Sequence, residues 1–168
     1  TVKKVAVILD APVTYADNET IRTVVKDKSA SIFKKPQFDI VSFEDTQQAV
    51  KIYREEHSMI ATNNVYQALK MADVQAIGKQ LGTDYVFMLK VNNDAPRMSA
   101  GFFTVSFKTT ITCDARVMNV AEGKYNYMKT FIKDGSSSAA LGVPSFNNAY
   151  KEALGKALEE IKIDTNTL

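Results

Sequence analysis

Few side chains in this sequence have the types and spacing needed for catalysis. His57 is the only histidine, and it follows Glu55 and Glu56 in the segment REEHS. These three residue types can ligate a metal ion, and a histidine can act as a general base. Adjacent residues of a helix point in different directions, however, and no nucleophile is matched to the histidine. We therefore expect a solvated histidine, with no metal site and no catalytic role.

Phosphate-binding loops and a reactive cysteine are not indicated either. The sequence contains neither a G-x-x-x-x-G-K-[ST] nor a G-x-G-x-x-G motif, and Gly78 with Gly82 forms only a helix-end pair. Cys113 is the single cysteine and lies in a strand-like alternation, where a buried structural thiol is common. We expect no enzyme activity and no cofactor.

A small polar ligand site is an alternative that the sequence leaves open. Asp10 ends the first apolar segment, and ligand sites of α/β proteins gather at the carboxyl ends of strands. Asp17 and Asn18 lie on the loop that follows, so the three side chains could bind a cation or a polar ligand. Turn formation and helix capping also explain Asp17 and Asn18 without any ligand.

Four large apolar side chains are the stronger candidates for function. Tyr15 lies in the first loop, and Met98, Phe102 and Phe103 lie beside the start of a long alternating segment. Exposed aromatic residues and methionine are typical anchors of protein interfaces. The competing interpretation is that these side chains cap the core.

The composition bounds the kind of domain that must position these residues. With 168 residues the chain can build one proper core, so we expect a single domain over residues 1–168. Its 21 Lys and Arg and 19 Asp and Glu are spread along the chain, so the sequence does not indicate the basic patch of a nucleic-acid-binding protein. No window approaches the roughly 18 apolar residues of a membrane-spanning helix.

The first half of the chain has the pattern of an α/β domain. Apolar runs over residues 2–11, 38–44 and 85–91 predict strands, and the first and third are apolar at both parities, as central strands are. Helices are expected after Asp17 or Asn18, after a capping box from Asp45 to Gln48, from Asn63, and from Asp73. Gly82 fits a left-handed residue that ends the last of these helices.

The second half predicts a long hairpin. After a loop over residues 92–101, residues 103–117 alternate strictly, which indicates one buried and one wet face. This run exceeds the usual strand length of about 3 to 10 residues, so it should pass beyond the helices or contain a bulge. A tight turn at 121–123 leads to the partner strand, and residues 135–145 predict a flexible loop. Ser145 or Asn147 can cap a final helix, with a frayed tail beyond Ile163.

These elements predict an α/β (α+β) domain. Its mixed sheet has about five strands flanked by helices, in the order β-α-β-α-α-β-β-β-α. The long antiparallel hairpin lies near residues 102–134.

Three segments in this order resemble the CsgG-like and TolB amino-terminal-like α/β domains of bacterial cell envelopes. The first is LGTDYV at 81–86, a helix end followed by an apolar strand, and the second is VMNVAEG at 117–123, a strand closing in a glycine turn. The third is the alanine- and leucine-rich helix at 149–161. Relatives in this superfamily include curli-secretion pore subunits and lipoproteins that activate peptidoglycan synthases.

The resemblance implies a periplasmic or other extracytoplasmic protein with a non-catalytic role. We expect it to dock another envelope protein or its own copies; the alternative is a small-ligand-binding domain using the loop after the first strand. Pore-forming relatives carry a long membrane hairpin where this chain has only residues 92–101, so no pore is expected. Because the chain starts at Thr1 directly ahead of a strand, we expect a removed signal peptide, and a lipid anchor could have preceded Thr1.

Overall fold

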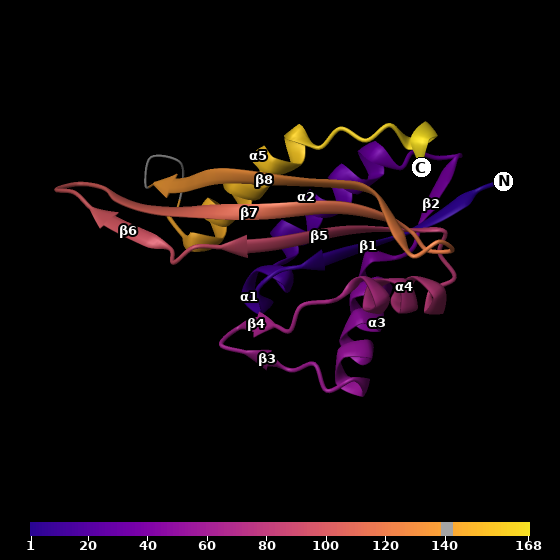
Figure 1. Ribbon diagram of the computed structural model, residues 1–168. Helices are drawn as coiled ribbons and strands as arrows, with labels where there is room; N and C mark the ends of the chain where they lie inside the picture. Colours follow the sequence, from indigo (N-terminus) through magenta and orange to yellow (C-terminus); the bar gives the residue numbers. More distant parts are fainter. Residues whose placement is uncertain (139–142) are drawn as a thin grey trace.

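A six-stranded mixed sheet forms the centre of the molecule in the computed structural model, which describes residues 1–138 and 143–168 (Figure 1). Its strands follow the order β2-β1-β5-β7-β6, and β8 pairs with the other edge of β7. The strands are β1 (Lys3–Asp10), β2 (Phe38–Ile40), β5 (Tyr85–Asn93), β6 (Arg97–Ala100), β7 (Val105–Asn119) and β8 (Lys124–Ser138). The helices are α1 (Val13–Ala16), α2 (Glu19–Ile32), α3 (Phe43–Glu56), α4 (Met71–Gln80), α5 (Phe146–Glu160) and the 3-10 helix η2 (Thr165–Thr167).

The direction of the strands confirms the predicted mixed sheet. Strand β1 runs parallel to β2 and β5, whereas β7 runs antiparallel to β5, β6 and β8. The predicted count of about five strands was one short, because residues 97–100 pair with β7 instead of forming a loop. Their sequence, RMSA, has no apolar alternation, and pairing with β7 determines its conformation.

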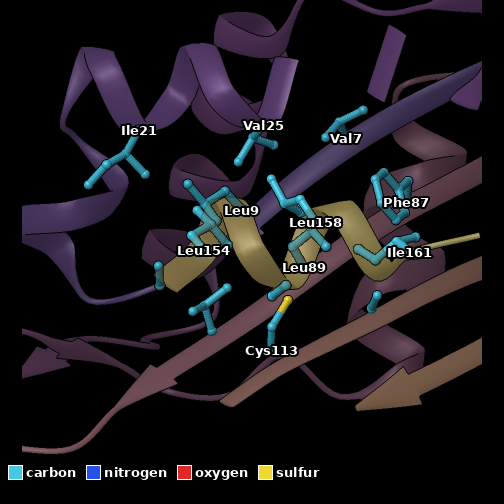
Figure 2. Packing of buried hydrophobic residues seen from close by; sticks show 14 of the residues in the cluster. Val7, Leu9, Ile21, Val25, Phe87, Leu89, Cys113, Leu154, Leu158 and Ile161 are labelled. Carbon is cyan, nitrogen blue, oxygen red and sulfur yellow. The ribbon is translucent and has the colours of Figure 1, made fainter. Parts of the chain in front are cut away.

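Both faces of the central strands are covered, as their apolar parities predict. On one face Val7, Leu9, Phe87, Leu89 and Cys113 pack against side chains of α2 and α5 (Figure 2). On the other face Ala6, Ile8, Val86 and Met88 pack against α3 and α4. The structure is therefore three layers, with α2 and α5 on one side of the sheet and α3 and α4 on the other.

Several predicted helix starts were wrong, because capping side chains lie elsewhere. Asn18 caps α2 as expected, but Ser42 caps α3 through the amide of Asp45, so the predicted capping box is not used. Asp73 lies inside α4 and accepts a hydrogen bond from the amide of Lys70, 2.7 Å away. Ser145 caps α5, and Gly82 has the expected positive φ of 66°.

The helix predicted from Asn63 is a two-stranded hairpin instead. Strand β3 (Ala61–Thr62) pairs antiparallel with β4 (Val65–Tyr66), and the turn consists of Asn63 and Asn64. Both asparagines have positive φ, 50° and 66°, which is the conformation that two-residue hairpin turns require.

The long hairpin is confirmed and extends further than predicted. Strands β7 and β8 have 15 residues each, and the expected irregularity is a bulge between Val117 and Met118. Strand β8 continues to Ser138, so 135–138 are not loop; the rest of that predicted loop includes 139–142, which lie outside the described residues. The tail forms η2, and Ile163 and Leu168 pack against the core, so it is not frayed.

Burial along β7 changes at Thr109. From Thr109 to Val117 the odd-numbered residues are all fully buried, facing α5, whereas Val105 on the same face is 36% exposed. Helix α5 lies very close to β8, since a Cβ added at Gly135 would come within 1.9 Å of the carbonyl oxygen of Ala149. The fully buried face therefore begins at Thr109, the fifth of the strand's 15 residues.

Candidate functional site

The most exposed apolar side chains lie on an arm that projects beyond the helices. We define the arm as residues 97–108, which comprise β6, the connection 101–104 and the start of β7 (Figure 1). Met98 is 64% exposed, Phe102 98% and Phe103 92%. The two phenylalanine rings lie 5.8 Å apart between centroids. These three residues, predicted as interface candidates, do not cap the core.

Backbone pairing and one carboxylate hold the arm in place. Strand β6 pairs with β7 from Arg97 opposite Lys108 to Ala100 opposite Val105. At the base of the arm, Asp94 accepts one hydrogen bond from the amide of Thr110, at 2.9 Å, and another from the hydroxyl of Thr109. The hydrogen bond from the Thr110 amide holds the pKa of Asp94 below its usual value. The arm is thus a hairpin with apolar anchors and, at its base, two cationic side chains opposite each other, Arg97 and Lys108.

Tyr15 does not belong to this surface, which corrects its predicted role. It lies in the short helix α1 and is only 7% exposed. Its ring stacks on that of Tyr150 in α5, with centroids 3.8 Å apart and planes 5° from parallel. Burial raises the pKa of both phenols. Tyr15 therefore joins α1 to α5 within the core.

Asp10 is part of a buried ion pair. Its Oδ1 lies 2.9 Å from the guanidinium of Arg54 in α3, and both side chains are more than nine-tenths buried. Arg54 also lies 4.4 Å from the ring centroid of Tyr66. The other oxygen of Asp10 and Nε of Arg54 have no hydrogen-bond partner among the described residues. Sequence reasoning missed Arg54, although its spacing from Val50 places it on the inward face of α3.

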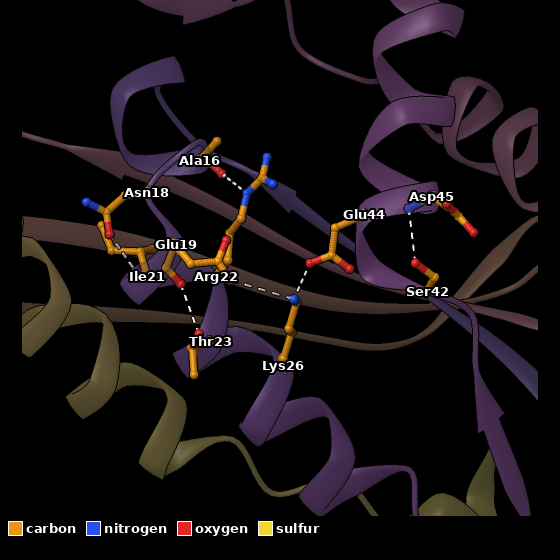
Figure 3. Close-up of polar contacts among 10 residues, drawn as sticks. All are labelled: Ala16, Asn18, Glu19, Ile21, Arg22, Thr23, Lys26, Ser42, Glu44 and Asp45. Atoms are coloured by element: carbon orange, nitrogen blue, oxygen red, sulfur yellow. Dashed lines mark hydrogen bonds and ion pairs between the residues drawn. The ribbon is translucent and has the colours of Figure 1, made fainter.

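Asp17 and Asn18 have separate local partners. Asn18 accepts a hydrogen bond from the amide of Ile21, 3.1 Å away, and so caps α2 (Figure 3). Asp17 pairs with Arg22 at 3.3 Å. Figure 3 also shows Lys26 of α2 paired with Glu44 of α3, and this contact lowers the pKa of Glu44.

Two hollows lie near the carboxyl end of β1. Asp10 and Asp17, two of the three predicted ligand residues, line different ones. A cleft of about 540 Å³ is lined by Asp17, Arg22, Gln47, Arg54 and Tyr66, among others. A smaller hollow of about 150 Å³ is lined by Asp10, Tyr66, Lys90 and Asn92, among others. Asn18 lines neither of them. The predicted trio is therefore not brought together as one site.

The contacts of His57 and Cys113, the remaining candidates for chemistry, are those of structural residues. His57 stacks on Tyr53, with centroids 4.0 Å apart, and its Nδ1 lies 2.8 Å from the carbonyl oxygen of Tyr53. A hydrogen bond to Asp73 raises the pKa of Tyr53 to about 12. Burial raises the pKa of the Cys113 thiol to about 12. Within residues 1–138 and 143–168, no cluster of three or more His, Cys, Asp or Glu could hold a metal ion.

In the part of the chain that the structure describes, no helix combines the length and the apolar character needed to cross a bilayer.

Comparison with known proteins gives only distant similarities of structure. No protein-family profile and no curated protein sequence matches the chain. A lipoprotein from Neisseria meningitidis is similar over 95% of this chain and 99% of its own, at 8% identity and a TM-score of 0.48. A hypothetical protein from Chlamydia trachomatis is similar over 95% and 93%, at 11% identity and a TM-score of 0.44.

The C-terminal domain of LpoB from Escherichia coli is a third similar structure. The similarity extends over 77% of this chain and 81% of the LpoB domain, with 13% sequence identity and a TM-score of 0.35.

Proposed function

We propose that this chain is a non-catalytic module of the bacterial cell envelope that docks another protein through its arm. The observation that supports this most is the exposure of Phe102 and Phe103, above nine-tenths each, at the end of an ordered hairpin. Two adjacent exposed phenylalanines cost solubility and contribute nothing to the core, so a partner that covers them would account for them. Met98 on β6 is a third exposed apolar side chain of the arm.

The arm offers two kinds of contact to a partner. Its aromatic rings and methionine can fill apolar pockets, which is how interface anchors contribute most of their binding energy. Among the described residues, strand β6 pairs with β7 along one edge only, so its other edge can accept a strand from another chain. Arg97 and Lys108, opposite each other in the ladder, favour a partner with acidic groups around an apolar centre.

The envelope location is part of the same proposal. It depends on the sequence motifs at 81–86 and 117–123, whose structural context is the one expected: a helix ended by Gly82, and a strand that closes at the Gly123 turn. Both glycines have a φ of 66°.

A binding experiment with envelope extract tests the proposal. The purified chain is immobilised, and the retained proteins are compared for wild type, the double variant Phe102→Ala with Phe103→Ala, and a control. The control is Ile60→Ala with Val65→Ala, because these side chains are 73% and 53% exposed on a different hairpin. We expect one envelope protein to be retained by wild type and control, with at least a tenfold loss for the arm variant. Equal retention by all three proteins would contradict the proposal.

A small-ligand-binding role is a second candidate, favoured by the unpartnered oxygen of Asp10. A carboxylate that is 93% buried and has one free oxygen usually has an unseen partner. Its hollow also contains Lys90 and Asn92, so a small molecule with hydrogen-bond donors would suit it.

A thermal-shift screen with divalent cations, amines, sugars and nucleotides tests this second role. A ligand that binds only the native state must raise the melting temperature, and the rise should be absent in Asn92→Ala. A library that leaves the melting temperature unchanged would exclude the role for those classes of ligand.

A further inference from the structure

Strand β8 forms a free edge of the sheet. It pairs with β7 along one side, and no other strand of the described chain pairs with it. Unpaired N–H and C=O groups of such an edge can bind another strand.

Hydrogen bonds at Thr110 identify the outward groups. The amide and the carbonyl oxygen of Thr110 both bond to Asp94, on the side of β7 away from β8. Thr110 is paired with Asp134, whose backbone groups must therefore point to the free edge. The carbonyl oxygen of Asp134 accordingly accepts a hydrogen bond from Lys156, at 3.0 Å. Because the pattern alternates, the N–H and C=O groups of Ile132, Thr130 and Met128 also point outward.

The part of this edge that is free to pair is short, because a different feature interrupts it at each end. At one end Val117 pairs with Tyr127 and Met118 with Tyr125, so Asn126 is bulged out of the ladder. At the other end the ammonium group of Lys156 donates a hydrogen bond to the carbonyl oxygen of Asp134, which is then not available to another strand. A regular free edge therefore extends over residues 127–133, with Thr130 at its centre.

We propose that a second copy of this chain pairs with this edge, antiparallel and about a two-fold axis through Thr130. This inference deepens the proposed docking role by naming a partner for the long hairpin, and it uses residues distant in sequence from the arm. The two sheets would then join into one continuous sheet. A self-complementary patch on both copies is what a two-fold dimer requires.

Side chains match across the two-fold axis in this register. Met128 lies opposite Ile132 of the second copy, and both side chains are more than 60% exposed on the face that α3 and α4 leave open. On the opposite face Lys129 lies opposite Phe131, a pair of a cation and an aromatic ring, and Tyr127 lies opposite Lys133, which pairs with Glu160 within its own copy. Each of these contacts occurs twice, and apolar or cation–aromatic pairs directly opposite each other stabilise an antiparallel ladder.

Neighbouring registers are opposed by charge. A two-fold axis at Lys129 would place the two Lys129 side chains opposite each other. An axis at Phe131 would place Lys129 opposite Lys133. Like charges directly opposite each other destabilise a ladder, so the axis at Thr130 is favoured over both neighbours. The lysines thereby oppose the two neighbouring registers, and a contact about a two-fold axis closes with two copies.

Cysteine crosslinking tests both the dimer and its register. A hydrogen-bonded pair in an antiparallel ladder has its Cα atoms about 5.5 Å apart, within disulfide range. Mild oxidation of Thr130→Cys should therefore yield a covalent dimer, as should Met128→Cys combined with Ile132→Cys. Met128→Cys alone is the matched control, because its two copies would lie four residues apart and should stay at least tenfold less crosslinked. The native thiol, Cys113, is fully buried and does not interfere.

Light scattering of Thr130→Pro provides a test without crosslinking. The N–H of Thr130 points away from β7, so proline removes an outward donor and leaves the backbone pairing with β7 intact. Proline also removes the hydrogen bond from the Thr130 hydroxyl to Asp114 of β7, so Thr130→Val, which loses that bond but keeps the N–H, is the control. We expect wild type to dimerise with rising concentration, and Thr130→Pro to dimerise at least tenfold more weakly while keeping its circular dichroism.

Two results would overturn the inference. One is a wild-type chain that stays monomeric throughout; the other is equal crosslinking of Thr130→Cys and the control Met128→Cys. Retention of an envelope protein by the arm is measured separately, with Phe102→Ala and Phe103→Ala. Failure of the dimer and failure of the docking role are therefore distinguishable.

Discussion

The two parts of β7, before and after Thr109, have the same alternating sequence and different surroundings. Odd-numbered residues from Ile111 to Val117 are fully buried beneath α5, whereas Val105 on the same face is partly exposed and Phe103, just ahead of the strand, is 92% exposed. Period-two alternation therefore predicts which residues share a face, but it does not predict which part of that face a helix covers. The uncovered part is where large apolar side chains remain available for binding.

The length and position of α5 account for the difference. The helix packs closely against β8 at Gly135, opposite Thr109 of β7, and the odd-numbered positions are fully buried from there onward. Beyond that point β7 pairs with β6 instead of β5, and the first turn of α5 reaches the arm at Phe107, whose ring packs edge-on against that of Phe146. Phe102 and Phe103, further along the arm, stay exposed.

Thiol reactivity should show the largest contrast between the two parts. Burial raises the pKa of Cys113 to about 12, so its thiolate forms only as the pH nears that value. A thiol in the variant Phe103→Cys should keep a pKa near 8.5, which gives it roughly a thousandfold more thiolate at pH 8. We expect a disulfide reagent to titrate one thiol in the folded variant and two after unfolding in urea. Rapid labelling of both thiols in the folded protein would contradict the comparison.

Truncating apolar side chains should give the next largest contrast. Ile111→Ala removes a fully buried side chain and should lower the free energy of unfolding by about 2–5 kcal/mol. Val105→Ala, six residues earlier on the same face, should change it by no more than about 0.5 kcal/mol. Urea unfolding followed by circular dichroism measures both, and similar losses would mean that the arm is part of the core.

Two glycines provide a third, smaller contrast. A Cβ at Gly135 would collide with the backbone of α5, so Gly135→Ala should destabilise the chain by about 1–3 kcal/mol. At Gly101, in the arm, the nearest atom is the hydroxyl oxygen of Thr104 at 3.2 Å, a side chain that can rotate. Gly101→Ala should therefore change the melting temperature by no more than a degree or two. An equal loss at both positions would show that α5 can shift away from β8.

The smallest effect concerns the base of the arm. The folded pKa of Asp94 is lowered, so its contribution to stability is complete above the unfolded pKa of about 4 and is lost as the pH falls through the lower folded value. Asp94→Ala should accelerate amide hydrogen exchange of Thr110 and β6 severalfold at neutral pH, with exchange in β1 unchanged. Unchanged exchange in β6 would mean that strand pairing alone holds the arm.

The parts of the fold that were predictable have local signals. Apolar residues at both parities indicated the central strands β1 and β5, and Gly82 indicated a left-handed helix end. Strand β6 was not predictable, because RMSA has no alternation and pairs only where β7 already provides a template. The Asn63-Asn64 turn had a recognisable signal, since two asparagines tolerate the positive φ values of a tight hairpin.

The candidate site was predictable only in part. Met98, Phe102 and Phe103 are exposed as expected, whereas Tyr15 is buried because α1 places its ring against Tyr150. That contact joins positions 135 residues apart, and no local pattern encodes it. The partner of Asp10, Arg54, is likewise distant in sequence, so the carboxylate looked free before the fold was known.

Photo-crosslinking from the arm tests the central claim most directly. A photo-reactive phenylalanine replaces Phe102 in cells that make this protein, and the same residue at Ile60, which is 73% exposed, is the control. We predict one discrete adduct with an envelope protein from position 102, reduced at least tenfold by adding Phe103→Ala, and no such adduct from position 60. The same adduct from both positions, or none from position 102, would contradict the assignment of the arm as the docking surface.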